Sequence, residues 1–321
     1  MEEVIKTEQS SELEHTEKIE QSKKKHPHLR RFLRILLILF VIGLLLLLYF
    51  YISSLFLQIE HYAVQANLTN PIRVVHLTDL HNAEFGNNNQ TLIEKVAEQN
   101  PDVIFMTGDM LNEDDENVEV VVHLVSELSK IAPVYYGYGN HETVWERNFG
   151  KDLHELLDAA GATVLECEYV DDEINGNIVR IGGYMGYWSQ PHMFAKSPEQ
   201  KEIEYQFFSD FRRNDLPNGE ETCRLVLNHI PTGWLDWHYI DAYDTGIVFS
   251  GHYHGGIIRV PIIDQGVIAP YVGWWPPYTK GVFVGEKSTC ILSTGLGIKR
   301  GIPRLNNPPE IVVVDLVPME P

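Results

Sequence analysis

The amino-acid sequence predicts an α/β domain that follows one membrane-spanning helix. Short apolar runs alternate with segments of helical periodicity between residues 72 and 160, which is the pattern of a largely parallel sheet with helices outside. The second half is richer in strands, and residues 35–57 carry no charged side chain. The 321 residues are enough for this apolar segment and one domain of roughly 250 residues with a sizeable core.

Residues 35–57 form the predicted membrane anchor, because this run is long enough to cross a bilayer as a helix. A cleaved signal peptide has a shorter apolar region with small residues directly behind it, so we expect the anchor to be retained. Basic residues precede the run, and the next one after it is Arg73. The positive-inside rule then predicts a single-pass protein of the cytoplasmic membrane, with a cytoplasmic N-terminus and an extracytoplasmic domain. The preceding bases are Lys23, Lys24, Lys25, Arg30, Arg31 and Arg34.

The predicted organisation has three parts. Residues 1–34 form a cytoplasmic tail, in which residues 1–22 are polar, Glu-rich and expected to be disordered, and the remainder is a basic segment beside the membrane. Residues 35–57 are the anchor. Residues 58–321 form one catalytic domain, because no repeat or second composition boundary divides them.

Charge and cysteine content exclude several classes of protein. The formal net charge is −20, and such a surface repels polyanions, so we expect no nucleic-acid partner. The three cysteines, Cys167, Cys223 and Cys290, are widely spaced and lack the spacing of a zinc knuckle. We expect each thiol to pack as a small apolar group.

The predicted strands and helices can be placed along the chain from their periodicity. In the first half, strands are expected at 72–78, 103–107 and 134–138, with helices at 89–99, 117–130 and 153–160. In the second half, strands are expected at 178–181, 224–227, 246–249, 281–284, 290–293 and 311–315, with a helix near 198–211.

Five of these strands end in residues that bind metal ions. Ligands gather outside the carboxyl ends of strands in an open α/β sheet, so these side chains are expected to meet. Carboxylate, amide and imidazole donors in this number suit two ions of the Mn, Fe or Zn type, held about 3.5–4 Å apart by a bridging carboxylate for a displacement at phosphorus. The residues are Asp79 and His81, then Asp109, then Asn140 and His141, then Asn228 and His229, and finally His252 and His254.

These five blocks, in this order, resemble the calcineurin-like metallophosphoesterase superfamily. The last block, the stretch at 295–307 and the anchor resemble its bacterial membrane-anchored, YkuE/YaeI-like phosphodiesterase branch, and the resemblance covers residues 71–316. It implies a four-layer α/β/β/α sandwich of two mixed β-sheets flanked by helices.

The resemblance also implies a role for each residue. A metal-bridging hydroxide would attack phosphorus, with His141 as the general acid and two divalent transition metals as cofactors, Mn being favoured over Fe or Zn. The first metal would be held by Asp79, His81 and His254, both metals by Asp109, and the second by Asn140, His229 and His252. Glu142 would orient His141, or be a solvated acid at a helix start. Asn228 would position a neighbouring ligand or phosphate, or cap a turn.

One departure from the superfamily bears on the substrate. The protein serine/threonine phosphatases of the superfamily continue the Asp109 block as Gly-Asp-x-x-Asp-Arg, whereas this chain has Asn112 and Glu113 at those last two positions. Without the phosphate-clamping arginine, a protein phosphatase is disfavoured and hydrolysis of a phosphodiester is the prediction. The anchor suggests a lipid- or envelope-linked substrate. The alternatives are a broad phosphomonoesterase, a two-metal amidohydrolase and a non-catalytic metal-binding relative.

Two loops are expected to determine specificity, at 183–198 and 257–280. The second contains the aromatic stretch 271–278. It could line the substrate cleft, contact lipid headgroups, or form a packed hairpin.

Overall fold

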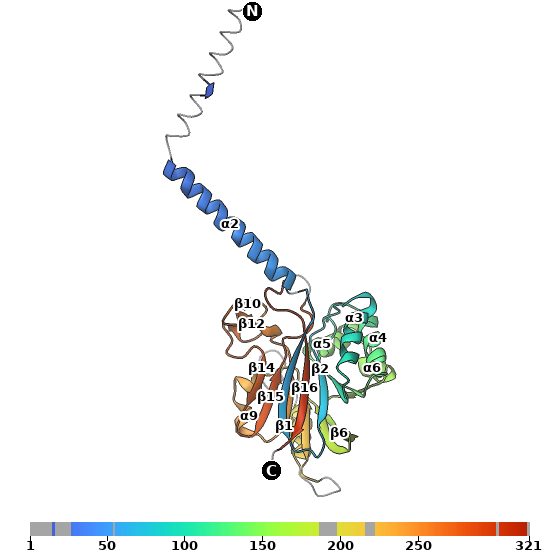
Figure 1. Cartoon of the computed structure of the whole chain (residues 1–321). Helices are drawn as coiled ribbons and strands as arrows, with labels where there is room; N and C mark the ends of the chain where they lie inside the picture. The colour runs from blue at the N-terminus through green and yellow to red at the C-terminus, as the bar shows by residue number, and fades with distance from the viewer. Residues whose placement is uncertain are drawn as a thin grey trace, which may run out of the picture. The chain divides into compact units, whose positions relative to one another are not determined.

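The computed structural model describes residues 15–16, 27–53, 55–185, 198–215, 222–299 and 302–319 (Figure 1). Most of the predicted disordered tail, and most of the loop at 183–198, lie outside these residues. By its contacts the chain divides into two units, Met1–Ile52 and Ser53–Pro321.

The first unit contains the helix α2 (Pro27–Ser53). Proline suits the first turn of a helix because its fixed φ is already helical. At a rise of 1.5 Å per residue, the helix is about 40 Å long. Among the described residues it is the one helix long and apolar enough to cross a membrane, by length and composition. It begins eight residues before the predicted run 35–57 and ends four residues short of its end, so its first turns carry the three arginines.

The first sheet of the second unit has the strand order β1-β16-β2-β3-β4-β5. The neighbours from β2 to β5 are parallel, as the alternating pattern predicts. Strand β16 runs antiparallel to β2 and parallel to β1, which makes the sheet mixed. The bounds are β1 (Gln58–Ala66), β16 (Glu310–Pro318), β2 (Ile72–Leu77), β3 (Val103–Met106), β4 (Val134–Gly137) and β5 (Ala162–Leu165).

The second sheet has the order β14-β15-β9-β8-β7-β6. Its central strands β15, β9, β8 and β7 are parallel, and the two edge strands are antiparallel to their neighbours. The bounds are β14 (Gly281–Val284), β15 (Ser288–Leu292), β9 (Gly246–Ser250), β8 (Cys223–Leu227), β7 (Asn177–Gly183) and β6 (Glu168–Ile174).

Three apolar cores separate four layers. Neighbouring strand residues point to opposite faces, so Val75 packs in the core beneath the helices of the first sheet while Val74 packs in the core between the sheets. Phe249 also lies between the sheets, and Val248 lies in the third core. The predicted four-layer α/β/β/α sandwich is therefore confirmed. The first sheet is covered by α3 (Gln90–Glu98), α4 (Glu119–Leu128), α5 (Asn140–Phe149) and α6 (Leu153–Ala159), and the second by α7 (Pro198–Phe211), α8 (Thr232–Leu235) and α9 (Tyr239–Ala242).

Several elements were not expected from the sequence. Strands β1, β5 and β6 were missed because they are short or mix polar and apolar residues without a clean alternation. The predicted loop at 257–280 contains two hairpins, β10–β11 and β12–β13, and the second includes the start of the aromatic stretch. The bounds are η1 (Asn87–Asn89), η3 (His254–Gly256), β10 (Arg259–Val260), β11 (Gln265–Gly266), β12 (Ile268–Ala269) and β13 (Gly273–Trp274).

Candidate metal centre

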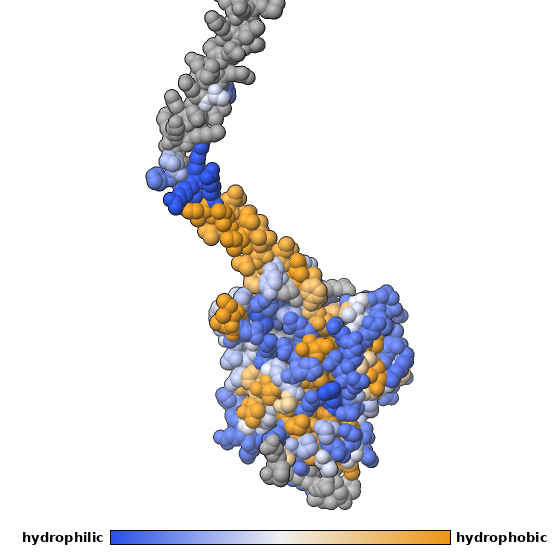
Figure 2. Space-filling view, in the orientation of Figure 1, coloured by the Kyte–Doolittle hydropathy of each residue, from blue (hydrophilic) through white to orange (hydrophobic). Residues whose placement is uncertain are grey.

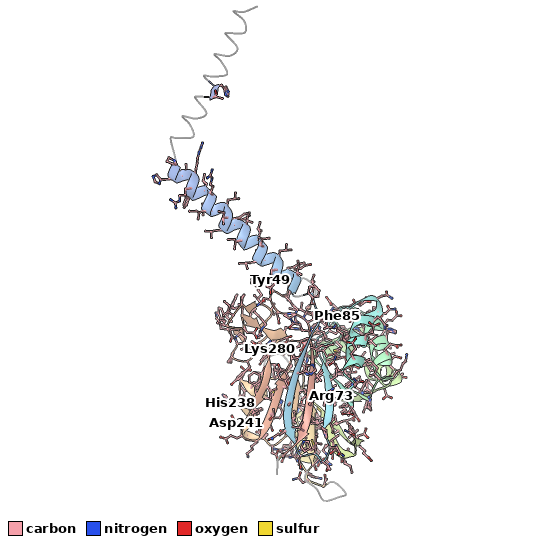
Figure 3. The ribbon with its side chains drawn as sticks, viewed as in Figure 1. Tyr49, Arg73, Phe85, His238, Asp241 and Lys280 are labelled. Carbon is pink, nitrogen blue, oxygen red and sulfur yellow. The ribbon has the colours of Figure 1, made fainter. Side chains whose placement is uncertain are left out.

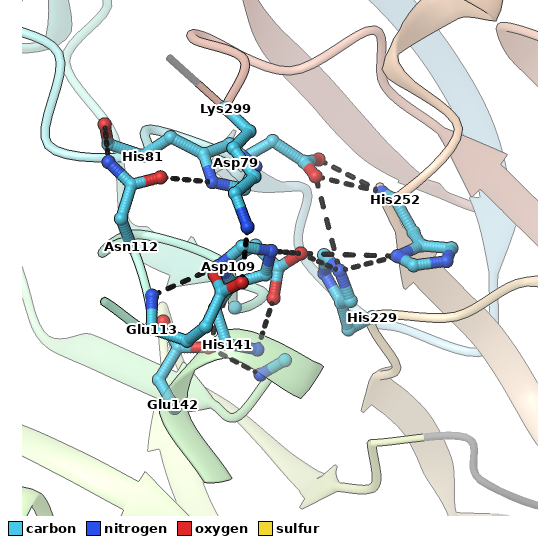
Figure 4. A network of polar contacts seen from close by, with 12 residues as sticks. Asp79, His81, Asp109, Asn112, Glu113, His141, Glu142, His229, His252 and Lys299 are labelled. Carbon is cyan, nitrogen blue, oxygen red and sulfur yellow. Dashed lines mark hydrogen bonds and ion pairs between the residues drawn. The ribbon is translucent and has the colours of Figure 1, made fainter. Parts of the chain in front are cut away.

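The candidate metal centre lies where three strands of the first sheet and two of the second end. Strands β2, β3 and β4 lead into Asp79, Asp109 and Asn140, and strands β8 and β9 lead into His229 and His252. Figure 4 shows side chains from both sheets converging on Asp109. In both sheets, therefore, the candidate ligands follow the carboxyl ends of strands, as expected.

Three groups of side chains offer ligand atoms that lie within 4.8 Å of one another. Asp109 belongs to two of the groups, and His81 joins one of these to the group of Asp79 and His254. The groups are Asp79, His81 and His254; Asp109, His229 and His252; and His81, Asp109 and His141.

The imidazole and carboxylate groups at the centre lie close together. Nε2 of His229 lies 2.9 Å from a carboxylate oxygen of Asp109 and 3.1 Å from Nδ1 of His252. On the other side, Nε2 of His254 lies 3.6 Å from Asp79. The backbone carbonyl of Thr107 accepts from Nδ1 of His229 at 2.7 Å, which directs Nε2 of that ring toward Asp109.

Unpartnered buried atoms show that the donor set fits metal ions. Nε2 of His81, Nε2 of His252, Nδ1 of His254 and Oδ1 of Asn140 are buried and have no hydrogen-bond partner among the described residues. Each such atom costs about 1–3 kcal/mol if it stays unsatisfied. Other buried atoms also lack a partner, such as Nδ1 of His76, but these four belong to predicted ligands and are of the types that coordinate Mn, Fe or Zn.

The pKa shifts describe a buried centre that requires positive charge. Burial lowers the pKa of His81 to about 3 and of His252 to about 4, so both imidazoles stay neutral, the form that coordinates metals. Burial alone would raise the pKa of Asp109, but His229 holds it well below its usual range. Burial lowers the pKa of His229, but the carboxylates of Asp109, Asp79 and Glu142 together outweigh it and raise this pKa to about 9. A proton on His229 therefore offsets carboxylate charge that bound cations would neutralise.

Strained backbone marks the same residues. Asp79, His81, Asp109, His252 and His254 all have left-handed φ values, between 46° and 67°. Non-glycine residues rarely adopt this conformation, and each instance costs on the order of 1–3 kcal/mol. Five such residues in one cluster indicate that the surrounding fold holds the ligands in place against their local preference.

Two glycines allow the backbone to approach the carboxylates closely. A Cβ on Gly139 would lie 2.3 Å from Oδ1 of Asp109, and a Cβ on Gly251 would lie 2.2 Å from Oδ2 of Asp79. A side chain at either position would therefore displace a predicted ligand.

Glu142 supports Asp109 instead of His141. It is fully buried, so its interpretation as a solvated helix-start acid is wrong. Its carboxylate accepts from the backbone N–H groups of Asp109, Met110 and Gly139 at 2.8–2.9 Å, and from the hydroxyl of Tyr136 at 2.8 Å. Glu142 therefore binds the backbone of the loop after β3, in place of the predicted contact with His141.

His141 is held by a residue that the sequence did not single out as its partner. The carboxylate of Glu113 contacts Nδ1 of His141 and, through its other oxygen, Nζ of Lys299 (Figure 4). Nε2 of His141 lies 3.8 Å from Asp109, on the side of the metal centre. The sequence showed an acid at position 113 in place of arginine, but this contact depends on the fold.

Other polar contacts fix the ligand loops. Asn112 donates to the backbone carbonyl of His81 at 2.9 Å, and its Oδ1 lies 3.2 Å from Nδ1 of the same ring. Asn228 donates to the carbonyl of Ile230 at 2.7 Å and accepts from the indole of Trp234 at 2.9 Å. These bonds agree with the turn-capping alternative for Asn228.

The chain matches a known protein family over most of the domain. Residues 72–256 match the sequence model of a family described as calcineurin-like phosphoesterase. The matched range is more than half of the chain and includes every candidate metal ligand.

Three bacterial relatives are similar over most of their length. YkoQ of Bacillus subtilis, described as an uncharacterized metallophosphoesterase, is 27% identical over 75% of this chain and 82% of YkoQ. YaeI of Escherichia coli, described as a phosphodiesterase, is 26% identical over 77% of this chain and 83% of YaeI. YkuE of Bacillus subtilis, described as an uncharacterized metallophosphoesterase, is 24% identical over 76% of this chain and 78% of YkuE.

Proposed function

Because the chain belongs to the calcineurin-like phosphoesterase family, we propose that it is a two-metal phosphodiesterase anchored in the cytoplasmic membrane by α2. The observation that carries the proposal is that Asp109 is shared by two of the three groups of ligand atoms, one of which shares His81 with the third. The predicted anchor, with the basic residues before it, favours an extracytoplasmic catalytic domain.

The described side chains fit the ligand roles that the family implies. Asp79, His81 and His254 would hold one ion, His229, His252 and Asn140 the other, and Asp109 both. When bound, the ions would polarise a phosphoryl oxygen and lower the pKa of water. The mixed oxygen and imidazole donors favour Mn, with Fe and Zn as further candidates.

His141 is the proposed general acid. The carboxylate of Glu113 contacts Nδ1 and orients the ring, while Nε2 lies on the side of the metal centre. As the bond between phosphorus and the leaving oxygen breaks, Nε2 would donate its proton to that oxygen. The leaving alcohol then departs neutral.

A phosphodiester fits this site better than a phosphomonoester. A phosphomonoester carries nearly two negative charges at neutral pH, whereas a phosphodiester carries one. Glu113 adds a negative charge next to His141, at the position where the protein serine/threonine phosphatases of the superfamily have an arginine. The description of YaeI as a phosphodiesterase supports the same choice. The anchor favours a substrate linked to a lipid or to the cell envelope.

The test compares bis-p-nitrophenyl phosphate with p-nitrophenyl phosphate, using the full chain in detergent after metal removal and reloading with Mn. We expect Mn-dependent hydrolysis that favours the diester and that falls sharply in His141→Ala. Faster monoester hydrolysis would identify a phosphomonoesterase. Metal binding with neither activity would favour a non-catalytic relative.

A further inference from the structure

The segment 257–280, here called the hairpin insertion, exposes large apolar side chains in two adjacent pairs. Ile262 and Ile263, at the turn of the β10–β11 hairpin, are 103% and 66% exposed. Trp274 and Trp275, in and after β13, are 71% and 58% exposed. Single exposed apolar residues are ordinary, but two adjacent pairs within one short insertion are not. Figure 2 shows apolar surface where Figure 1 places β10 and β12.

The hairpin insertion is a firmly packed structure and not a loose loop. Buried Arg259 donates to the carbonyl of Gly255 at 2.7 Å and to Thr279 at 3.1 Å, so it joins the start of the insertion to its end. The side chain of Gln265 donates to the carbonyl of Pro276 at 2.7 Å, which links the first hairpin to the tryptophan pair. The exposed side chains are therefore presented on a fixed platform.

The platform lies against the candidate metal centre. The ring of Tyr271, in the turn of the β12–β13 hairpin, stacks on His252 with 4.9 Å between centroids and 17° between planes. Because His252 is a predicted metal ligand, anything bound by the hairpin insertion lies close to the proposed catalytic residues.

The chain enters the domain at this same edge. Strand β1 runs parallel to β16 and both run antiparallel to β2, so β1 begins at the edge where β2 leads into Asp79. Lys280 of the hairpin insertion, labelled in Figure 3, lies 3.8 Å from Glu60 in β1 and 3.2 Å from Asp264 beside the isoleucine pair. Residues 54–57 alone separate the end of α2 from β1 in the sequence.

We propose that Ile262, Ile263, Trp274 and Trp275 form a lipid-docking surface that inserts into the interface of the bilayer. Tryptophan favours the boundary between headgroups and acyl chains, and isoleucine favours the acyl chains. The net charge of −20 opposes attraction to anionic lipid, so docking rests on apolar contact. A lipid surface is favoured over a protein partner because the surface adjoins the segment by which the chain arrives from its apolar helix.

The docking surface indicates a substrate class, and this step rests on the proposed function. A metal centre beside a lipid-docked platform would face the headgroup region, where the phosphodiesters of phospholipids lie. Docking itself requires no catalysis, so the two ideas can fail separately.

Tryptophan fluorescence tests the docking directly. The chain has six tryptophans and α2 contains none, so the anchor does not contribute to the signal. We would reconstitute the full chain into phosphatidylcholine vesicles whose acyl chains carry bromine, a quencher of tryptophan. Quenching is expected in the wild type and should fall about twofold or more in the Trp274→Phe/Trp275→Phe variant. Trp237→Phe, an exposed tryptophan outside the hairpin insertion, is the matched control and should retain the quenching.

Equal quenching in the wild type and the double variant would overturn the proposal. Crosslinking between chains through these positions, without quenching by lipid, would also overturn it and would identify the surface as an interface between two copies. Hydrolysis of soluble bis-p-nitrophenyl phosphate by the same samples separates the two failures, because it reports on the proposed function and not on docking.

Discussion

The carboxylate of Glu113 joins His141 to Lys299, with one oxygen against Nδ1 of the imidazole and the other against the ammonium group. Glu113 also presents its backbone N–H to the same ring nitrogen, at 3.2 Å. His141 therefore has a fixed ring orientation without any contact from Glu142. This arrangement makes Glu113 the proposed positioning residue for the general acid.

Replacing Glu113 by glutamine should lower kcat for a diester about 10- to 100-fold while leaving metal content unchanged, because the ring of His141 loses its carboxylate partner. The alkaline limb of the pH–rate profile, where a general acid loses its proton, should change as well, since a purely structural role would not affect it. Steady-state kinetics and metal analysis measure both.

The matched control is Glu116→Gln, which removes an exposed carboxylate paired with Lys151 at 2.7 Å on the surface. This variant should behave like the wild type. Equal activity and an unchanged pH profile in Glu113→Gln would show that Glu113 has no part in positioning His141.

Alanine at position 139 should displace Asp109. The φ of Gly139 is −99°, which alanine tolerates, so the effect would come from the new Cβ 2.3 Å from the Asp109 carboxylate. We expect reduced affinity for metal and loss of hydrolysis in a folded protein, measured by titration calorimetry and circular dichroism. Gly150→Ala, at the other end of α5, meets no atom within 4 Å and should cost only about 1–2 kcal/mol of strain at its φ of 61°. Similar metal affinity in the two variants would contradict this account.

Metal binding should release a proton from His229. Asp109 raises the pKa of this imidazole to about 9 in the metal-free protein, so it is protonated below about pH 9 and must lose the proton to coordinate a metal. Calorimetry near neutral pH, in buffers of different ionisation enthalpy, should report this release, and the release should fade as the pH rises above about 9. His229→Gln should lack it. Binding without proton release at neutral pH would argue that His229 is neutral in the metal-free centre.

Glutamine at position 142 should destabilise the fold and loosen the loop that carries Asp109. The new amide would point an N–H donor at backbone N–H groups that now bond to the carboxylate, and each unsatisfied buried group costs about 1–3 kcal/mol. Chemical denaturation with and without Mn measures the change. Glu98→Gln, an exposed position, is the control, and equal stabilities in the two variants would contradict the proposed support.

The sequence places the candidate metal ligands because their positions depend on local rules. Each lies directly after an apolar strand, and parallel strands deliver their carboxyl ends to one edge. The partners of these ligands could not be predicted in the same way. Glu113 contacts His141, which is 28 positions away in the sequence. Glu142 accepts from the backbone N–H of Asp109, which is 33 positions away. Such contacts are properties of the packed fold.

The fold was predictable where its periodicity is clear and not elsewhere. Strands β2 and β3 are almost wholly buried, and their continuous apolar runs predict them. Strand β1 alternates irregularly between exposed and buried residues and holds its place through pairing with β16, more than 240 positions away. The hairpins of the hairpin insertion are only two residues long on each side, too short to leave a periodic signal.

The number of metal ions bound per chain tests the central claim most directly. Two divalent ions should bind the wild type after reloading with Mn, and one or fewer should bind Asp109→Asn, because this residue is shared by two of the ligand groups and is the proposed bridge. Hydrolysis of bis-p-nitrophenyl phosphate should fall in parallel. Two ions and undiminished hydrolysis in Asp109→Asn would contradict the two-metal assignment.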